Sequence, residues 1–324
     1  MARLALDVMG GDHAPANPVA AAILAAQELG SAHQIQLVGR TAEVRAELTR
    51  QSAKAHFEII EAPDVIEMTD KPSVAIRGKP NSSMAVGIKL QVEGKSDAFI
   101  SAGNTGAQMA ASTFLLRLHE GLTRPAISTI FPTAKQPIVV LDSGANVDCS
   151  PAELVQFARL GAVYARDILG RENPAVGLLS IGEEPEKGNA AVKEAHQLLL
   201  KSGLNFIGNV EGRDLPRGEC DRGPIDIVVC DGFTGNVLLK FYEAVAPTIF
   251  GMLAKAGVTR EQLGAVAGKL DYAKYGGAPL LGLKGVSIIC HGKSTPEAIK
   301  NGILVGLRAV ESRMSHHIGE QLVT

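Results

Sequence analysis

Tryptophan is absent from the 324-residue chain, and aromatic residues make up only 4% of it. Surfaces that bind single-stranded nucleic acids depend on aromatic rings for base stacking, so this scarcity argues against that class of protein. The charge balance argues the same way. The chain has 32 basic and 34 acidic residues, a net charge of −2, without the positive excess typical of nucleic-acid binding. We therefore expect no nucleic-acid partner.

Paired cysteines and export signals are also lacking. The four cysteines, at positions 149, 220, 230 and 290, form no C-x-x-C pair, and two of them end apolar runs. We expect buried free thiols in a reducing compartment. The N-terminal stretch MARLALDVMGGDHAP has a short apolar run but no cleavage site for a signal peptidase. No run reaches about 18 uninterrupted apolar residues. We therefore expect a cytoplasmic protein without a membrane-spanning helix.

Short apolar runs rich in β-branched residues alternate with longer Ala- and Leu-rich stretches. We predict strands at LALDVM, IQLVG, FEIIEA, DAFIS, PIVVLD, AVGLLSI, NFIGNV, DIVVCD and VSIIC, and helices over 18–29, 106–118, 151–169, 189–202 and 296–310. Such alternation is typical of parallel strands joined by crossover helices. Runs that are apolar throughout suit strands covered on both faces. The predicted fold class is α/β, a mostly parallel sheet with helices on both faces.

Local signals mark one helix start and one long excursion. Ser150 is placed to cap a helix, with Pro151 at its first position and Glu153 completing a capping box. Residues 63–83 are polar and carry three prolines, which predicts a long excursion or a mobile flap. No linker is clear enough to divide the chain. We therefore predict one large α/β catalytic domain over 1–324.

Glycine-rich turns follow seven of the predicted strands. In chain order they read GGDHAP, AGNTG, SGANVDCS, GEEPEKGN, NVEGRD, GFTGN and HGKS. The carboxyl ends of parallel strands lie along one edge of an open sheet, where ligands bind. Glycine lets the backbone approach a ligand closely, and the N-terminus of the following helix favours an anion. One such turn is an ordinary strand-to-helix connection, but seven together predict a site for phosphate or carboxylate.

Several familiar catalytic motifs are absent. No G-x-G-x-x-G with an acidic residue about 20 positions further on follows a strand, and the P-loop-like HGKST lacks its first glycine, since that position is Ser287. There is no G-x-S-x-G to support an acyl-serine mechanism. The eight histidines show no metal-binding spacing, and we interpret His316 and His317 as part of a solvated tail. We expect neither a nucleotide nor a metal.

Four side chains in these turns could contribute charge or hydrogen bonds to an anion site. Lys187 lies just before a helix, where the alternative is an ordinary solvated surface charge. Asn236 either faces the site or caps the next helix. His13 and His291 each follow a strand and are either site residues or structural histidines. The residues alone leave these alternatives open.

The turns and their flanking sequences together form a specific set. The segments DVMGGDHAP, SAGNTGA, LDSGANVDC, LLSIGEEPEKGN, GNVEGRD, DIVVCDGFTGNVLLK and DYAKYGGAPLLG span nearly the whole chain. In this order they resemble the bacterial phosphate acyltransferase family, whose members transfer a fatty acyl group from acyl carrier protein to inorganic phosphate. The acyl phosphate then feeds phospholipid synthesis. The resemblance implies a fold similar to isocitrate and isopropylmalate dehydrogenases, a homodimer, and no metal or other cofactor.

The resemblance also implies roles for individual residues. Lys187 and Asn236 match positions associated with catalysis. A role in holding phosphate or substrate, or in shaping the site, is implied for a larger set: Asp7, Gly10, Gly11, Asp12, His13, Gly103, Asn104, Thr105, Gly144, Asn146, Asp231, Thr234 and His291.

The chain departs from the family pattern in three places. Ser143 stands where valine is expected, and Lys293 stands where serine is expected. Segment 237–270 is apolar, with few charges and a proline, whereas members that dock on membranes are often longer and richer in lysine there. A basic interfacial helix is therefore not supported. We interpret the segment as a dimer contact or core helix, with peripheral membrane contact as the alternative.

The implied reaction needs little covalent help from the protein. Phosphate is already an anionic nucleophile and a thioester an activated donor, so we expect direct attack without an acyl-enzyme. Lys187 would neutralise charge, and Asn236 would donate a hydrogen bond to the carbonyl oxygen or orient phosphate. The departing thiolate needs at most a weak acid, such as one of the two histidines named above.

Partners follow from the same resemblance. Acyl carrier proteins are acidic, so a local basic rim is expected, with candidates Lys255, Arg260, Lys269, Lys274 and Lys284. A downstream glycerol-3-phosphate acyltransferase and the inner face of the cell membrane are further expected contacts. Three alternatives stay open. These are a phosphate acetyltransferase-type enzyme using acyl-coenzyme A, a metal-dependent hydroxyacid dehydrogenase, and a non-catalytic lipid-pathway scaffold of the same fold.

Overall fold

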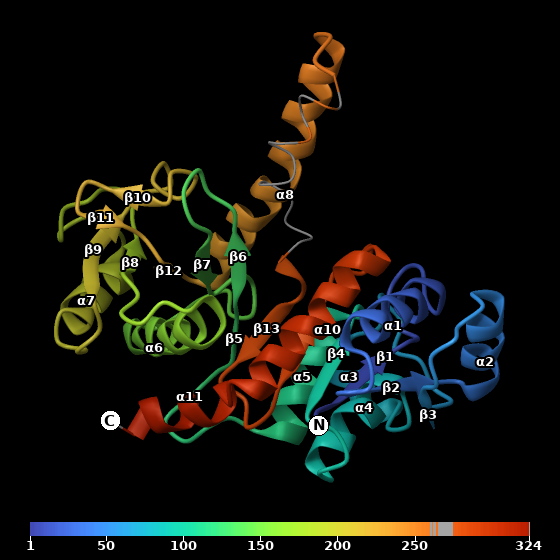
Figure 1. The fold of residues 1–324 in the computed structure, drawn as a ribbon. Coiled ribbons are helices and arrows are strands. Elements are labelled where there is room, and N and C mark those ends of the chain that lie inside the picture. The colour runs from blue at the N-terminus through green and yellow to red at the C-terminus, as the bar shows by residue number, and fades with distance from the viewer. Residues whose placement is uncertain (260, 262–263, 265–274, 324) are drawn as a thin grey trace. The chain divides into compact units, whose positions relative to one another are not determined.

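The computed structural model describes residues 1–259, 261, 264 and 275–323 (Figure 1). Its contacts divide the chain into two compact units where the sequence suggested a single domain. Unit 1 comprises Met1–Pro125 and Ala273–Thr324, and unit 2 comprises Ala126–Tyr272. The chain leaves unit 1 and later returns to it, so no single linker marks the division. That is why no boundary is visible in the composition.

Unit 1 is built on a mostly parallel sheet. Its strands are β1 (Arg3–Asp7), β2 (Gln34–Gly39), β3 (Glu58–Glu61), β4 (Ala98–Ser101), β13 (Ala278–Leu281) and β14 (Ser287–Ile289). They lie in the order β3-β2-β1-β4-β14-β13. All pairs are parallel except β13 with β14. β4 is buried throughout and β1 nearly so, as their uninterrupted apolar sequences predicted.

Seven helices of unit 1 are described: α1 (Ala16–Leu29), α2 (Thr41–Arg50), α3 (Pro72–Gly78), α4 (Ser83–Val92), α5 (Thr105–Leu116), α10 (Pro296–Glu311) and α11 (Met314–Val323). α1 packs on α10 and α4 packs on α5, while α4 and α10 both contact β1 and β4. The prediction that His316 and His317 belong to a solvated tail is wrong as far as the backbone is concerned, because it is helical there. Residues 314–323 form α11, which Met314 and Ile318 anchor with buried side chains.

The predicted excursion over 63–83 contains the short helix α3 and is fastened by one lysine. The Lys79 ammonium donates to the Val65 carbonyl at 2.8 Å and pairs with Asp70 at 2.6 Å. These contacts tie the two ends of the excursion together. The prolines therefore exclude a long helix there without excluding local order.

Unit 2 contains a second, mostly parallel sheet with strand order β6-β7-β12-β8-β9. The strands within the residues of unit 2, not all of them in this sheet, are β5 (Ala126–Ile127), β6 (Thr129–Phe131), β7 (Ile138–Leu141), β8 (Val176–Leu179), β9 (Phe206–Val210), β10 (Glu219–Cys220), β11 (Gly223–Pro224) and β12 (Ile227–Val229). β7, β12, β8 and β9 run parallel, whereas β6 is antiparallel to β7. β10 and β11 form a small antiparallel pair.

Three helices of unit 2 are described: α6 (Pro151–Leu169), α7 (Ala190–Leu199) and α8 (Gly232–Lys255). α6 packs on β7, β12 and α7. The capping box predicted at its start is confirmed, since the Ser150 hydroxyl accepts from the Glu153 amide and the Glu153 carboxylate accepts from the Ser150 amide. Every predicted strand has a counterpart. The additional strands β5, β6, β10, β11 and β13 have two to four residues each, too few to show a period.

α8 begins on the core of unit 2 and carries an exposed apolar face. Leu238, Leu239 and Tyr242 pack against the core. On another face, large apolar side chains are exposed: Phe233, Val237, Phe241, Ile249, Met252 and Leu253. Its 18-residue apolar window has no buried residue, so the core-helix interpretation of segment 237–270 is wrong for the part described. Residues 260, 262–263 and 265–270 lie outside the described residues.

By length and composition alone, α8 could also cross a membrane. No spanning helix is expected from the sequence, because Lys240 and Glu243 interrupt the apolar run of α8. One helix of this kind is weak evidence for a span, since two charges near the middle of a lipid-exposed helix are costly. An exposed apolar face of this kind is typical of a surface that binds another protein or a membrane.

Candidate active site

A buried carboxylate organises the turns at the carboxyl end of unit 1's sheet. Asp7 ends β1 and is 2% exposed. Its Oδ1 accepts from the Met9 amide at 3.0 Å, and its Oδ2 accepts from the Ser101 hydroxyl at 2.7 Å. The Ser101 oxygen in turn accepts from the Gly103 amide at 2.9 Å. Asp7 therefore joins the turn after β1 to the turn after β4, and burial raises its pKa.

Close backbone packing brings the turns after β1, β4 and β14 together. A Cβ at Gly10 would lie 2.8 Å from the Gly103 nitrogen and 2.7 Å from the Asp7 carboxylate. The Asp12 amide donates to the Gly292 carbonyl at 2.8 Å. Gly11 has a φ of +106° that favours glycine. The predicted residues of the GGDH, SAGNTG and HGKS turns therefore belong to one cluster.

Asn104 is committed to structure in this cluster. Its Oδ1 caps α5 by accepting from the Ala107 amide at 3.0 Å. Its Nδ2 lies within 3.0–3.3 Å of the carbonyls of Glu67, Met68 and Asp70. The side chain thus holds the 63–83 excursion against the start of α5. What the turn can offer an anion is the backbone: the first N–H groups of a helix, at Thr105 and Gly106, have no intrahelical acceptor.

The two predicted histidines of unit 1 are exposed beside these turns. The His13 side chain and the Asp12 side chain are both exposed. His291 is exposed as well, and its Nδ1 accepts from the Lys293 amide at 3.1 Å, which leaves Nε2 as the free ring nitrogen. Lys293, the departure from the family pattern, therefore fits the turn through its backbone. Neither histidine is a buried structural residue.

A second buried carboxylate organises the turn after β7 in unit 2. Asp142 is 0% exposed and accepts from the backbone amides of Ile127, Gly144, Ala145 and Asn146 at 2.6–3.2 Å. Its Oδ2 also accepts from the Asn146 Nδ2 at 2.9 Å. Burial raises the pKa of Asp142, although these donors act in the opposite direction. Asn146 thus supports the turn from inside it.

The structure explains why serine is tolerated at position 143, where the family pattern has valine. It is buried, and its hydroxyl donates to the Val140 carbonyl at 3.1 Å. A serine therefore satisfies its polar atom locally where valine would bury a methyl group. The departure leaves the turn intact.

The start of α8 packs on this turn through glycines. The Gly232 amide donates to the Asn146 carbonyl at 2.7 Å. A Cβ at Gly235 would lie 1.9 Å from the Asp142 carbonyl oxygen, so no larger residue fits there. The approach places Asn236 beside Gly144, where a Cβ at Gly144 would be 3.4 Å from the Asn236 Cβ. The structure therefore brings two predicted site residues from separate turns together.

Asn236 is exposed and is not the cap of α8. That role falls to Asp231, whose carboxylate accepts from the Thr234 amide at 2.8 Å and from the Thr234 hydroxyl at 3.0 Å. The capping alternative for Asn236 is thus wrong. Asp231 and Thr234, both predicted to bind substrate, are engaged with each other at the helix start.

Lys187 lies in the turn after β8, the neighbour of β12 in the sheet. Its side chain is exposed, and the described residues give it no ion-pair partner. Its stem lies over Gly182, since a Cβ at Gly182 would be 2.8 Å from the Lys187 Cγ. Because the turns after β7, β12 and β8 share one edge of the sheet, this edge carries an uncommitted cation and an exposed amide.

Three of the four cysteines, Cys149, Cys230 and Cys290, are unsuited to act as nucleophiles. Burial raises the pKa of Cys149 and of Cys290 to about 12, and raises that of Cys230 as well. The thiolate is the reactive form, so these thiols are inert near neutral pH. The predicted buried free thiols are confirmed for Cys220, Cys230 and Cys290, whereas Cys149 is only partly buried.

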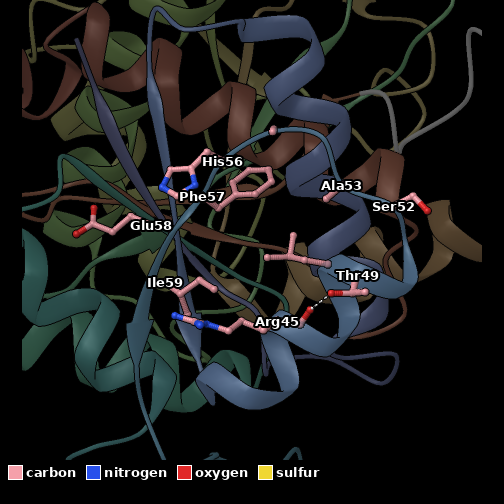
Figure 2. A pocket seen from close by; sticks show the side chains of 10 residues that line it. Arg45, Thr49, Ser52, Ala53, His56, Phe57, Glu58 and Ile59 are labelled. Carbon is pink, nitrogen blue, oxygen red and sulfur yellow. Dashed lines mark hydrogen bonds between the residues drawn. The ribbon is translucent and has the colours of Figure 1, made fainter.

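A hollow in unit 1 lies outside these turns. Figure 2 shows it lined by α2 and the segment that leads into β3, with Arg45, Thr49, His56 and Phe57 among the lining residues. None of the predicted site residues lines it. At the surface of α11, His316, His317 and Glu320 form one group of three potential metal ligands. Neither feature shares a residue with the turns, so neither is part of the candidate site.

Sequence reasoning missed the two residues that hold the turns together. Asp142 was passed over because it reads as the last residue of a strand, and Ser101 because it reads as part of a Gly-rich turn. A signal was available, since both strand ends pair an aspartate with a Gly-rich turn, in DVMGG and DSGAN. Candidate cations Lys255 and Lys284 are exposed. Arg260, Lys269 and Lys274 lie outside the described residues.

Solved structures show which class of protein has this fold. A phosphotransacetylase from Staphylococcus aureus superimposes with a TM-score of 0.66 at 13% identity, covering 95% of this chain and 94% of its own. A 4-hydroxythreonine-4-phosphate dehydrogenase from Salmonella typhimurium gives 0.53 at 13% identity, with 95% and 99% covered. The fold is therefore that of the phosphotransacylases and related dehydrogenases, as predicted.

Sequence comparison narrows the class to a family. Residues 2–317 match the family described as "Fatty acid synthesis protein". A phosphate acyltransferase from Desulforamulus reducens is 48% identical over 332 aligned positions, covering 99% of this chain and 98% of the relative. The chain belongs to the phosphate acyltransferase family, and it is an acyltransferase enzyme of fatty acid and phospholipid synthesis.

Proposed function

We propose that this enzyme transfers a long-chain fatty acyl group from acyl carrier protein to inorganic phosphate. The product would be an acyl phosphate for phospholipid synthesis. The observation that carries the proposal is the edge of unit 2, where Asn236 meets Gly144 and the neighbouring turn presents an uncommitted Lys187. A cation and an amide donor are what a phosphate nucleophile and a developing oxyanion require.

The proposed chemistry is direct attack. A phosphate oxygen forms the new bond to the thioester carbonyl carbon, and the carbon–sulfur bond breaks as the thiolate departs. Lys187 neutralises charge on phosphate or on the developing oxyanion, and Asn236 donates to the carbonyl oxygen or orients phosphate. The raised pKa values of Cys149, Cys230 and Cys290 support a path without an acyl-enzyme on any of these three thiols. Holding both reactants in line can supply about 7–11 kcal/mol of the barrier.

A direct comparison of three acyl donors tests which thioester the enzyme uses. Purified enzyme with phosphate is given palmitoyl acyl carrier protein, palmitoyl-coenzyme A or acetyl-coenzyme A, and the acyl phosphate is trapped with hydroxylamine. We expect the highest kcat/KM with the carrier protein. A preference for acetyl-coenzyme A would establish a phosphate acetyltransferase-type enzyme instead. Binding of the carrier protein without any product would favour the scaffold alternative.

The carrier protein is acidic, and we propose that it docks on an exposed lysine, with Lys255 of unit 2 and Lys284 of unit 1 as separate candidates. Charge reversal at either lysine should raise KM for the carrier protein and leave KM for phosphate unchanged. The effect should weaken as salt is added, because exposed charges are screened. A loss of activity independent of salt would contradict this docking.

We propose that the exposed apolar face of α8 packs against a second copy of the chain. Lys240 and Lys255 are the only basic residues of this helix, so it lacks the dense positive charge of an interfacial membrane helix. Sedimentation of a Phe241→Glu, Met252→Glu variant should show a monomer where the unmodified protein is a dimer. A dimer that persists, with lost vesicle binding, would assign the face to the membrane. We further propose that the enzyme acts in the cytoplasm, beside a membrane-bound acyltransferase that consumes the acyl phosphate.

A further inference from the structure

A buried polar side chain lies behind the Lys187 turn and holds it. Asn209 lies in β9 and is 0% exposed. Its Nδ2 donates to the Glu184 carbonyl at 2.8 Å. The same carbonyl accepts from the Lys187 amide at 3.0 Å. One carbonyl therefore joins the core of unit 2 to the backbone of the candidate catalytic lysine.

A buried histidine fixes the orientation of Asn209. His196, in α7, is 4% exposed, and its Nδ1 lies 2.9 Å from the Asn209 Oδ1. Because the Asn209 Nδ2 donates to a carbonyl, its Oδ1 must be the acceptor, so His196 carries a proton on Nδ1. The ring also packs edge-on against Phe206, with centroids 5.1 Å apart. The His196 ring therefore makes two separate contributions, a hydrogen bond to Asn209 and packing against Phe206.

Two neighbouring residues of the turn are held by different means. Glu183 pairs with Arg222 at 3.4 Å and with Arg213 at 3.6 Å, and all three groups are at or near the surface. Pairs of this kind contribute little and are screened by salt. The Glu184 carbonyl is instead held by Asn209, whose own side chain is fully buried although the hydrogen bond itself is partly buried. A buried donor that loses its acceptor is costly, so we expect Asn209 to contribute more than these ion pairs to the position of the turn.

We propose that Asn209, oriented by His196, is a positioning residue for Lys187. The link runs from the His196 ring to the Asn209 amide, to the Glu184 carbonyl and to the Lys187 backbone. Gly182 leaves the lysine stem room to lie against the turn. The role of Lys187 in the reaction rests on the proposed function, whereas the positional link does not.

The test begins with Asn209→Asp, which keeps the size and the acceptor for His196 but places an oxygen against the Glu184 carbonyl. We expect kcat to fall about 10–10²-fold, because small displacements of a catalytic group have effects of this size. KM for the acyl donor should stay within about threefold, in keeping with an interaction made in the transition state. Hydrogen–deuterium exchange should rise in a peptide covering 183–188 and stay unchanged in β12.

A matched pair at His196 separates positioning from packing. His196→Asn retains a donor near Nδ1 and loses the ring, whereas His196→Phe retains the ring and loses the donor. Positioning predicts that His196→Asn loses thermal stability but keeps kcat, while His196→Phe loses kcat and gains exchange at 183–188. If activity followed melting temperature across the pair, the proposal would be overturned.

The exchange measurement needs no turnover, so it also separates the two proposals. Raised exchange at 183–188 in an enzyme that never forms acyl phosphate would retain the link and reject the proposed function. Unchanged exchange and unchanged kcat in Asn209→Asp, in an enzyme that does form acyl phosphate, would reject the link alone.

Discussion

Each unit places a buried aspartate at the end of a strand, but the two carboxylates accept hydrogen bonds from different kinds of donor. Asp7 accepts from the Met9 amide of its own turn and also binds across segments through the Ser101 hydroxyl, which joins the turns after β1 and β4. Asp142 binds its own turn and the nearby Ile127, almost entirely through backbone N–H groups. A hydroxyl can reverse its direction of donation, whereas an N–H group cannot. The turn of unit 2 therefore depends more strictly on a carboxylate.

The two units also differ in whether the polar side chains near these aspartates are already hydrogen-bonded within the protein. In unit 1, Asn104 is spent on capping α5 and tethering the 63–83 excursion, so the turns offer mainly backbone amides. In unit 2, Asn236 is exposed beside the turn that Asp142 holds, and Lys187 is exposed in the turn after β8, with no ion pair among the described residues. The turns of unit 2 therefore offer a cation and an amide, whereas those of unit 1 offer mainly backbone N–H groups.

The largest effect should follow removal of the uncommitted cation in unit 2. Lys187→Ala should lower kcat/KM about 10²–10³-fold, as expected for loss of one group that stabilises transition-state charge. Lys193→Ala, an exposed lysine on the next helix, is the matched control and should leave the rate unchanged. Steady-state kinetics with palmitoyl acyl carrier protein and phosphate measure both. A rate for Lys187→Ala within about threefold of the parent would remove the lysine from the mechanism.

A smaller loss should follow disturbance of Asn236 through its neighbour. Gly144 has a φ of +133°, and an added Cβ would be 3.4 Å from the Asn236 Cβ. Gly144→Ala should therefore lower kcat/KM up to about 10²-fold by displacing the amide. Gly170→Ala is the control, because Gly170 also has positive φ but meets no atom within 4 Å. Equal activity losses in both variants would trace the effect to backbone strain rather than to Asn236.

The difference between Asp142 and Asp7 should appear in the free energy of unfolding of their asparagine variants. Asp142→Asn places an amide NH₂ against the N–H donors of its own turn, and should lower the free energy of unfolding by about 1–3 kcal/mol. Asp7→Asn should cost less, about 1 kcal/mol, because the Ser101 hydroxyl can turn to accept. Urea denaturation of both variants measures the difference. A larger loss for Asp7→Asn would reverse the comparison between the units.

The smallest effect concerns pH. Burial raises the pKa of Asp142 in the folded protein, so between the ordinary aspartate pKa of about 3.9 and the raised value the native state binds more protons than the unfolded state. Stability from this group is therefore present below that window and falls as pH rises through it. The stability difference between the parent and Asp142→Asn should shrink from pH 4 upward. A difference that grows with pH would show that the N–H donors outweigh burial.

Much of the fold could be predicted from the sequence, because buried parallel strands leave uninterrupted apolar runs such as DAFIS and DIVVCD. The antiparallel β13 was missed because APLL has no period, and the two-unit division was missed because unit 1 is discontinuous. For the site, glycine-rich turns at strand ends identified Gly144 and Asn236. The commitment of Asn104 to three carbonyls could not be predicted, since it depends on where the 63–83 excursion folds back.

The most direct test of the central claim is release of free thiol from palmitoyl acyl carrier protein with and without inorganic phosphate. We predict release only when phosphate is present, with an acyl phosphate that hydroxylamine traps, and its loss in Lys187→Ala. Release at the same rate without phosphate would identify a thioesterase and contradict transfer to phosphate.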